Sequence, residues 1–127
     1  MFNDEIIEVY EKEESISKIV LGINKFSFDD LIKTDHFYYS LDEKSSDINF
    51  IKDKFKEFHR IKLVNKRKHR NQKLSYDFYY ELDNGFYLLY SIALENKPIL
   101  LNAFLVNRNF KEFKKNLLKA YKNKIIG

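Results

Sequence analysis

Two strand-like runs joined by an Asn-Gly pair constrain the fold of this chain more than any other feature. Over residues 74–83, large apolar side chains occupy every second position, which is the period of a strand with one buried face. Asn84 and Gly85 follow, and because both residue types accept a positive φ, they predict a two-residue turn. Residues 86–94 are apolar on both faces, which indicates a central strand. These patterns together predict a β-hairpin.

The residues after this hairpin extend it into a sheet and a helix. Pro98–Val106 is a further apolar run and predicts a buried strand that begins at its proline. Phe110–Lys124 carries apolar residues at helical spacing, with Asn107 or Asn109 as the N-cap. A basic stripe opposes these apolar residues and consists of Lys111, Lys115, Lys119 and Lys122.

The N-terminal part is read from shorter patterns. Glu5–Tyr10 fits either a strand or the first turn of a helix, and the β-branched content of Ser17–Ile23 favours a strand. Ser27 is placed to cap a short helix, whereas the aromatic run Phe37–Leu41 is ambiguous. Ser46–Arg60 repeats apolar residues at steps of three and four, which predicts a helix capped by Ser45 or Ser46.

Composition is consistent with one folded domain over residues 1–127, because 44% of the residues are apolar and 17% are aromatic. The predicted fold class is α+β: an antiparallel β-meander of three or more strands packed by helices, with a C-terminal helix. The chain has no cysteine, which suits a reducing compartment. Its acidic start lacks a long apolar run, so we expect neither a signal peptide nor a membrane anchor, and a cytoplasmic location.

Charge is distributed very unevenly. Residues 1–59 hold 8 basic and 14 acidic residues, whereas the segment Arg60–Lys73 holds seven Lys or Arg and no acid. Such a segment predicts contact with a phosphate backbone. A solvated loop, pairing with the acidic N-terminal half, and an acidic protein partner remain as alternatives. The candidate nucleic-acid-binding residues are Arg60, Lys62, Lys66, Arg67, Lys68, Arg70, Lys73, Tyr79 and Arg108.

Aromatic and titratable residues suggest how this segment would act. A two-residue turn would place Tyr79 opposite Tyr90, where their rings could stack on bases. A metal-independent ribonuclease needs a base, an acid and a cation for the phosphorane. The candidate catalytic residues are His59, His69 and Glu81 for proton transfer and Arg70 for the cation, with Arg67 and Arg108 as further cations. His59 could equally interact with a helix end, and His36 is read as structural.

Metal and cofactor chemistry finds no support in the sequence. Asp29, Asp30, Asp35 and His36 are close together, but their spacing matches no recurring ligand pattern, so we expect the aspartates to cap or solvate a short helix. The chain has no HExxH, CxxC, phosphate-binding Gly-rich loop or GxSxG element. We therefore expect no metal and no cofactor.

The C-terminal segments YYELDNGFYLLYSI, KPILLNAFLVNRN and FKEFKKNLLKAYKN resemble the C-terminal part of RelE/HigB-like toxins, the small ribonucleases of toxin–antitoxin pairs. The resemblance implies a hairpin, a buried strand and a basic tail helix, preceded by two helices and a first strand. It also implies an antitoxin as partner. The family commonly has a basic residue soon after the position of Tyr87, where it meets the scissile phosphate. Leu88 and Leu89 stand there in this chain, so the resemblance favours the fold more than the activity.

Two functional hypotheses follow from these patterns. The first is a small basic RNA-binding protein of a mobile element, which would be a metal-independent endoribonuclease toxin if the resemblance extends to activity. The alternative is a non-enzymatic, phage-type inhibitor that binds a host defence or nucleic-acid-handling protein. The acidic run Asp4–Glu14 would then imitate nucleic-acid charge or dock a basic partner, although such a run is more often a solvated face. An oligomeric structural protein is a third option.

Overall fold

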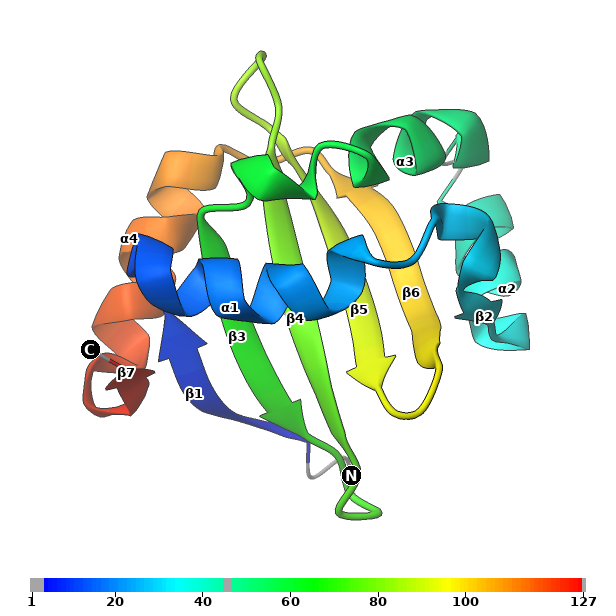
Figure 1. Ribbon diagram of the computed structural model, residues 1–127. Helices are drawn as coiled ribbons and strands as arrows, with labels where there is room; N and C mark the ends of the chain where they lie inside the picture. The colour runs from blue at the N-terminus through cyan, green and yellow to red at the C-terminus, as the bar shows by residue number, and fades with distance from the viewer. Residues whose placement is uncertain (1–3, 45–46, 127) are drawn as a thin grey trace.

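The computed structural model describes residues 4–44 and 47–126 and shows an α+β fold (Figure 1). Seven strands form one sheet in the order β2-β6-β5-β4-β3-β1-β7. The strands are β1 (Glu5–Tyr10), β2 (Ile32–Lys33), β3 (Leu63–Lys68), β4 (Leu74–Glu81), β5 (Tyr87–Leu94), β6 (Pro98–Val106) and β7 (Ile125–Ile126). The helices are α1 (Glu13–Asn24), α2 (Asp35–Glu43), α3 (Ile48–Phe55) and α4 (Phe110–Ala120), with 3-10 turns η1 (Phe28–Asp30), η2 (Phe58–Arg60) and η3 (Lys122–Lys124).

The predicted meander forms the middle of this sheet. Strands β3, β4, β5 and β6 follow one another antiparallel, and β1 joins β3 antiparallel. The sheet as a whole is mixed, because β7 pairs parallel with β1 and β2 pairs parallel with β6. The α+β class is therefore confirmed, but the sheet is not purely antiparallel, and the C-terminal helix is followed by a short edge strand.

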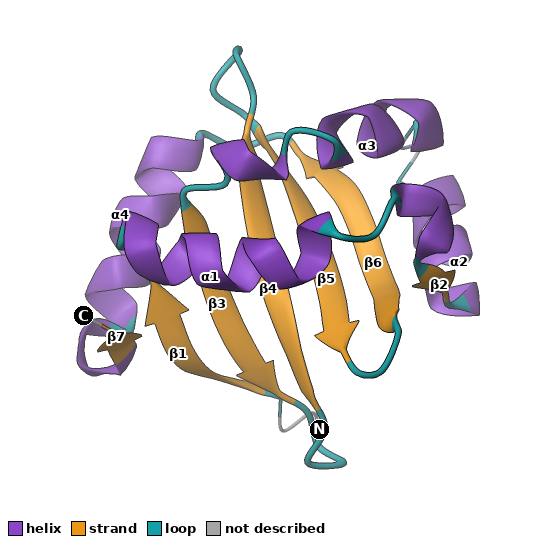
Figure 2. Ribbon diagram, viewed as in Figure 1, coloured by secondary structure: helices purple, strands orange, loops and turns teal. Residues whose placement is uncertain are grey.

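Helices cover both faces of the sheet (Figure 2). Phe78 and Tyr80 of β4 belong to a core cluster with residues of α1, α2 and α3. Tyr79 lies between them in sequence and belongs to a second cluster, with Phe110 and Leu117 of α4. Since successive residues of a strand point to opposite faces, α4 covers the face of the sheet that α1 leaves free.

The expected strand at Ser17–Ile23 is wrong, because these residues lie within α1. Ile16, Val20 and Ile23 are buried at steps of four and three, which is the period of one helix face. Packing of this face against the sheet outweighs the β-branched content of the segment. Glu13 and its neighbour Glu14 lie in the first turn, where a negative charge favours the helix dipole.

The hairpin is present, but its turn and its burial differ from the expectation. The amide of Leu82 donates to the carbonyl of Phe86 at 2.8 Å, so three residues form the turn, and Gly85 alone among them has a positive φ, of 88°. This extra residue shifts the register, and Tyr79 faces Leu89. Strand β4 is also buried on both faces, because helix α4 and a polar network cover the side that its sequence predicts to be wet.

Capping residues set the helix ends. Asp47 caps α3 by accepting from the amide of Asn49 at 2.9 Å, whereas Ser45 and Ser46 lie outside the described residues. Asn109, and not Asn107, caps α4 by accepting from the amide of Glu112 at 2.9 Å. Thr34 caps the ambiguous aromatic run, which is helical in α2. Across the described ranges, no helix is long and apolar enough to span a bilayer.

Candidate nucleic-acid interface

The middle of the basic segment Arg60–Lys73 is a strand of the sheet, and its ends form a 3-10 turn and the β3–β4 turn. The segment ends η2, forms the whole of β3 and turns into β4. Strand β3 lies between β1 and β4, and β1 is acidic. In this antiparallel pairing Glu5 faces Lys68 and Glu8 faces Lys66. The fold thus brings acidic residues from the start of the chain to the basic segment, which is one of the alternatives that the sequence leaves open.

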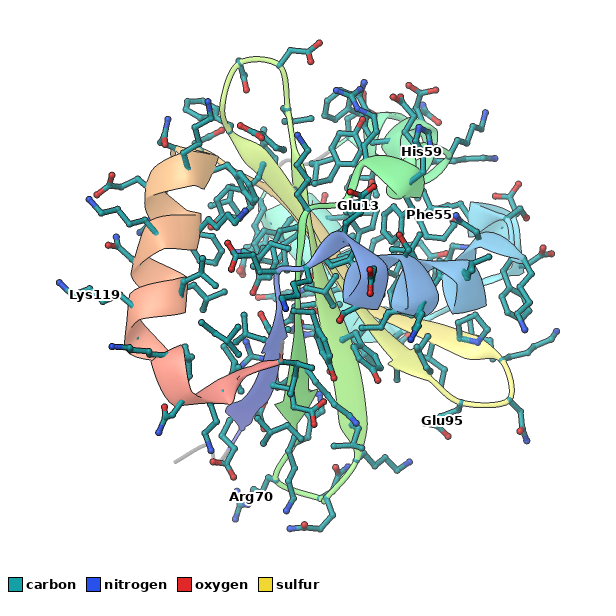
Figure 3. All side chains as sticks on the ribbon, turned by 60° about the vertical axis from the view of Figure 1, so that its left-hand side comes forward. Glu13, Phe55, His59, Arg70, Glu95 and Lys119 are labelled. Carbon is teal, nitrogen blue, oxygen red and sulfur yellow. The ribbon has the colours of Figure 1, made fainter. Side chains whose placement is uncertain are left out.

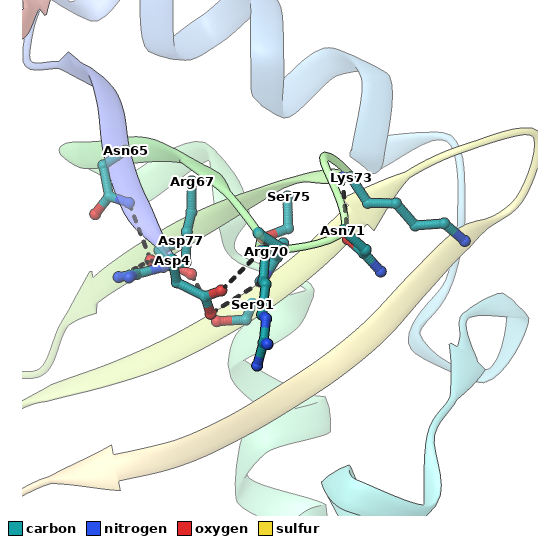
Figure 4. A network of polar contacts seen from close by, with 10 residues as sticks. Asp4, Asn65, Arg67, Arg70, Asn71, Lys73, Ser75, Asp77 and Ser91 are labelled. Atoms are coloured by element: carbon teal, nitrogen blue, oxygen red, sulfur yellow. Dashed lines mark hydrogen bonds and ion pairs between the residues drawn. The ribbon is translucent and has the colours of Figure 1, made fainter. Parts of the chain in front are cut away.

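Arg67 is held by a buried carboxylate. Asp77 is 2% exposed, and its Oδ2 accepts from Arg67 Nε at 3.0 Å, from Arg67 Nη2 at 2.9 Å and from Asn65 Nδ2 at 2.9 Å (Figure 4). Its Oδ1 accepts from Ser91 Oγ at 2.6 Å. Burial lowers the pKa of Arg67, but Asp77 more than offsets this and raises the pKa above its usual value. The guanidinium is therefore already used within the protein.

Tyr79 does not offer its ring to a base, contrary to the expectation. Its hydroxyl donates to Asn65 Oδ1 at 2.5 Å, and its ring centroid lies 4.9 Å from that of Phe113. Burial, assisted by the charge of Asp77, raises the pKa of Tyr79 well above its usual value. Tyr90 is buried on the opposite face and donates to the carbonyl of Ile51 at 2.6 Å. The shifted hairpin register separates these two rings.

Arg60 and Lys66 also have acidic neighbours. Arg60 Nη1 donates to Glu57 Oε1 at 3.0 Å and to the hydroxyl of Tyr80 at 3.1 Å. The hydroxyl of Tyr80 in turn donates to Glu57 Oε1 at 3.1 Å. The hydrogen bonds that Glu57 accepts from Arg60 and from Tyr80 lower the pKa of its carboxyl. Lys66 Nζ lies 4.0 Å from Glu8 Oε1 and 5.8 Å from the ring centroid of Tyr76. Both cations are thus partly neutralised.

Both ring nitrogens of His69 are engaged by neighbours. Nδ1 lies 3.2 Å from Asp4 Oδ2, and Nε2 lies 2.7 Å from Ser75 Oγ. Asp4 also accepts from the backbone amide of Arg70 at 3.2 Å. A surface pocket of about 370 Å³ adjoins the ring, with Lys73 among its lining residues. His69 therefore fastens the β3–β4 turn to the start of the chain, and in this arrangement neither nitrogen is open to a substrate.

The four candidate catalytic residues do not form one cluster. His59 lies in η2 before the start of β3, and Glu81 ends β4 at the same end of the sheet. His69 and Arg70 follow the other end of β3, which is about 20 Å away for a strand of six residues. Figure 3 shows His59 and Arg70 at opposite ends of the molecule. No site combining all four is therefore present.

The aspartates near η1 take part in capping and pairing. Asp30 Oδ2 accepts from the amide and the hydroxyl of Ser27, each at 3.0 Å, and these bonds lower the pKa of Asp30. Asp29 forms an ion pair with Lys52 at 2.8 Å. Within residues 4–44 and 47–126, no three His, Asp or Glu side chains are grouped closely enough to hold a metal ion.

The C-terminal basic residues are arranged differently from the segment above. We define the lysine stripe as Lys111, Lys115 and Lys119 of α4 with Lys122 of η3. All four residues are exposed, and none lies in an ion pair within the described part of the chain. Lys119 points away from the sheet in Figure 3.

Neighbouring cations extend this surface. Lys114 lies 3.9 Å from Glu11, and Arg108, a predicted site residue, is exposed just before α4. Four further members of the predicted set have side chains with no ion pair among the described residues. They are Lys62, Lys68, Arg70 and Lys73. The spacing of the lysine stripe is visible in the sequence. The sequence nevertheless predicts the binding site at Arg60–Lys73, because basic residues are more concentrated there.

Comparison with known proteins adds no identity. No protein-family model, curated protein or solved structure matches this chain. The resemblance to RelE/HigB-like toxins therefore rests on the sequence patterns alone. Leu88, at the position where that family commonly has a basic residue, is buried in the core beneath α1 and α3, so its side chain cannot meet a phosphate.

Proposed function

We propose that this protein binds RNA through the lysine stripe of its C-terminal helix. The observation that carries the proposal is that three lysines line one exposed face of α4 and exposed Lys122 follows in η3, and that none of the four has an acidic partner among the described residues. Unpaired cations bind phosphates by releasing condensed counterions, and this release drives most non-specific nucleic-acid binding. Glu112 is the only acidic residue between Asn107 and Ile126, so the local field is positive.

The contribution of the first basic segment is smaller in this proposal. Its arginines Arg60 and Arg67 are bound to carboxylates, and freeing them for a phosphate would leave Asp77 buried without a cation. Of the remaining cations, Lys68 faces Glu5 across the β1–β3 pair, and the backbone amide of Arg70 donates to Asp4. We assign no cleavage to the protein, because the four candidate catalytic residues lie in two separate places, with His59 and Glu81 at one end of the sheet and His69 and Arg70 at the other.

Two charge-matched variants test the proposal. The stripe variant carries Lys111→Gln, Lys115→Gln, Lys119→Gln and Lys122→Gln. The control variant carries Lys62→Gln, Lys68→Gln, Arg70→Gln and Lys73→Gln, which removes three exposed charges and the half-buried Lys68 of the first segment without breaking a described ion pair. Each variant lowers 23 basic residues to 19, equal to the number of acidic residues, so the formal net charge is zero in both.

The measurement is the affinity for a fluorescently labelled RNA in about 50 mM salt and EDTA. We expect the stripe variant to lose affinity by roughly 100-fold and the control by less than about threefold. Equal losses would indicate only a net-charge effect, and a loss confined to the control would return the interface to Arg60–Lys73. Shortened RNA in the same samples would show that the protein also cleaves RNA, an activity that the lysine stripe alone does not explain.

A protein partner, such as an antitoxin or a host defence protein, is a second candidate function. The observation that favours it is a set of exposed apolar side chains on α1 and α2, where Leu21 is 67% and Tyr39 is 63% exposed. Aromatic side chains such as Tyr39 are enriched in protein interfaces relative to the rest of the surface. If this function holds, Leu21→Ser with Tyr39→Ser will abolish capture of one stoichiometric protein that nuclease treatment does not release. Unchanged capture would contradict it.

A further inference from the structure

The positions of the exposed aromatic rings bear on the kind of RNA that the stripe can bind, and this inference rests on the proposed function. Proteins that hold single strands combine cations with rings on which the unpaired bases stack. Three aromatic side chains are strongly exposed in the described residues: Tyr38, Tyr39 and Phe50. They lie on α2 and α3, which flank the β2–β6 edge of the sheet.

Helix α4 lies near the other edge, beside β1 and β7 (Figure 1). The rings close to it are used in packing: Tyr87 stacks on Phe113 with centroids 4.8 Å apart, and Phe110 and Tyr79 are buried in the same cluster. Within the part of the chain that the structure describes, a strand lying on the lysines would therefore find no exposed ring beneath its bases. These residues thus offer no stacking there, which contributes about 1–3 kcal/mol per base in single-strand binders.

The spacing of the stripe suits the backbone of a duplex. From Lys111 to Lys119 the chain rises about 12 Å along the axis of α4, and Lys122 follows in η3 beyond the helix end. One strand of a duplex places about three to four phosphates along that length. Successive lysines of α4 are four residues apart, or about 6 Å, so a single row of phosphates can pass along the stripe.

The chemistry of the exposed helix face favours RNA over DNA as the duplex. DNA-reading helices present Arg, Asn or Gln to base edges in the major groove. The exposed face of α4 offers lysines, Glu112, Ala120 and one amide, Asn116. An A-form RNA duplex has a major groove too narrow for side chains, so it is recognised mainly through its backbone and shape. A face that contacts phosphates and reads no bases matches that mode.

We propose that the lysine stripe of α4 and η3 binds double-stranded RNA along the phosphates of one strand, independently of base sequence. The contacts are made by Lys111, Lys115, Lys119 and Lys122, with Arg108 extending the row past the helix N-terminus. The exposed rings of α2 take no part in this binding.

The test compares three probes of one 20-nucleotide sequence with the full chain: the single RNA strand, its RNA duplex and the corresponding DNA duplex. At about 150 mM salt we expect the RNA duplex to bind roughly tenfold more tightly than the single strand. A second RNA duplex of scrambled sequence should bind within about threefold of the first, because no base is read. The stripe variant should lose the duplex affinity.

Other outcomes overturn the inference in distinguishable ways. Tighter binding of the single strand, or of the DNA duplex, would contradict it while leaving nucleic-acid binding intact. Binding of no probe would overturn the proposed function as well. The variant Tyr38→Ser, Tyr39→Ser removes only exposed side chains, so it should fold and keep its duplex affinity. A tenfold loss in that variant would show that the rings contact RNA and would contradict the assignment.

Discussion

Two regions of this molecule carry the same number of basic residues, but three cations of the first and one of the second lie in a described ion pair. Arg60–Lys73 holds seven Lys or Arg with no acid, and Arg108–Lys124 holds seven with one acid. In the first region, the guanidinium of Arg67 lies against a buried carboxylate, and Arg60 and Lys66 have acidic neighbours. In the second region, one cation, Lys114, lies in a described ion pair. Charge density along a sequence therefore does not give the charge available at the surface.

The cause of this difference is the position of each element in the fold. Strand β3 has a neighbouring strand on both sides, so its side chains meet those of β1 and β4. Both neighbours contribute acids at facing or adjacent positions, Glu8 from β1 and Asp77 from β4. Helix α4 packs by one face alone and leaves the opposite face to solvent. The interior strand β3 thus has two of its three cations in described ion pairs, whereas the covering helix α4 has one of its four lysines in such a pair.

The largest expected effect concerns the carboxylate beneath the first region. Asp77→Ala would leave Arg67 partly buried without its partner and would remove hydrogen bonds from Asn65 and Ser91. We expect a loss of about 3 kcal/mol in the free energy of unfolding, measured by urea denaturation with circular dichroism. The matched control is Asp83→Ala, because Asp83 is 98% exposed and lies 3.8 Å from Arg60. A change of about 0.5 kcal/mol or less in both variants would show that the pair is dispensable.

The hydroxyl of Tyr79 offers a sharper probe of the same network. Tyr79→Phe keeps the ring against Phe113 but removes the donor to buried Asn65. We expect a loss of about 1–2 kcal/mol, because Asn65 Oδ1 would remain buried and unpaired. Tyr87→Phe is the control, since the Tyr87 ring belongs to the same cluster and its hydroxyl has no described hydrogen bond. Equal effects of the two changes would contradict the role given to the hydroxyl.

The cap of α4 tests the stability of the second region. Asn109 accepts from the amide of Glu112, so Asn109→Ala should lower the free energy of unfolding by about 1 kcal/mol. Asn107→Ala should change it by less than about 0.5 kcal/mol, because Asn107 is exposed outside the helix. Thermal melts of both variants provide the comparison. A larger effect of Asn107→Ala than of Asn109→Ala would contradict the assignment of Asn109 as the N-cap of α4.

The smallest expected effect is the pH dependence of the pair between Glu57 and Arg60. Hydrogen bonds from Arg60 and Tyr80 lower the pKa of Glu57 in the folded state. A carboxyl whose pKa is lower in the folded state stabilises the fold at pH values above its unfolded pKa, near 4.5. This stabilisation is lost as the pH falls through the folded pKa. We therefore expect the stability difference between wild type and Glu57→Gln to shrink as the pH is lowered from 7 to about 3. A constant difference would mean that ionisation of Glu57 contributes nothing.

Much of the fold follows from local patterns that need no knowledge of neighbours. The hairpin, the proline-led strand and the helix after Asn109 each depend on side-chain period and turn or cap chemistry, and the structure confirms them. The length of the turn could not be predicted from the sequence. A two-residue turn at Asn84-Gly85 and a three-residue turn at Asp83-Asn84-Gly85 both place the glycine where a positive φ is needed. That one residue places Tyr90 opposite Phe78 instead of Tyr79, so the rings of Tyr79 and Tyr90 lie on opposite faces of the sheet.

The errors at the candidate site have one physical origin, which is contact between distant segments. The acids that neutralise the first basic region lie as far away in sequence as Asp4, which is 65 residues from His69. The helical burial of Ser17–Ile23 depends on an aromatic core assembled from α3, β4 and β5. The local period of residues cannot report such partners. The lysine stripe could be predicted, because a helix places residues four apart on the same face.

The salt dependence of RNA binding tests the central claim most directly. For each variant, the logarithm of the association constant is plotted against the logarithm of the salt concentration, and the slope counts the phosphate contacts. We predict that the stripe variant has a slope shallower than wild type by roughly 3–4, about one per lysine removed. The control variant with Lys62, Lys68, Arg70 and Lys73 replaced should keep the wild-type slope. The reverse result, a slope lost in the control and kept in the stripe variant, would contradict the account.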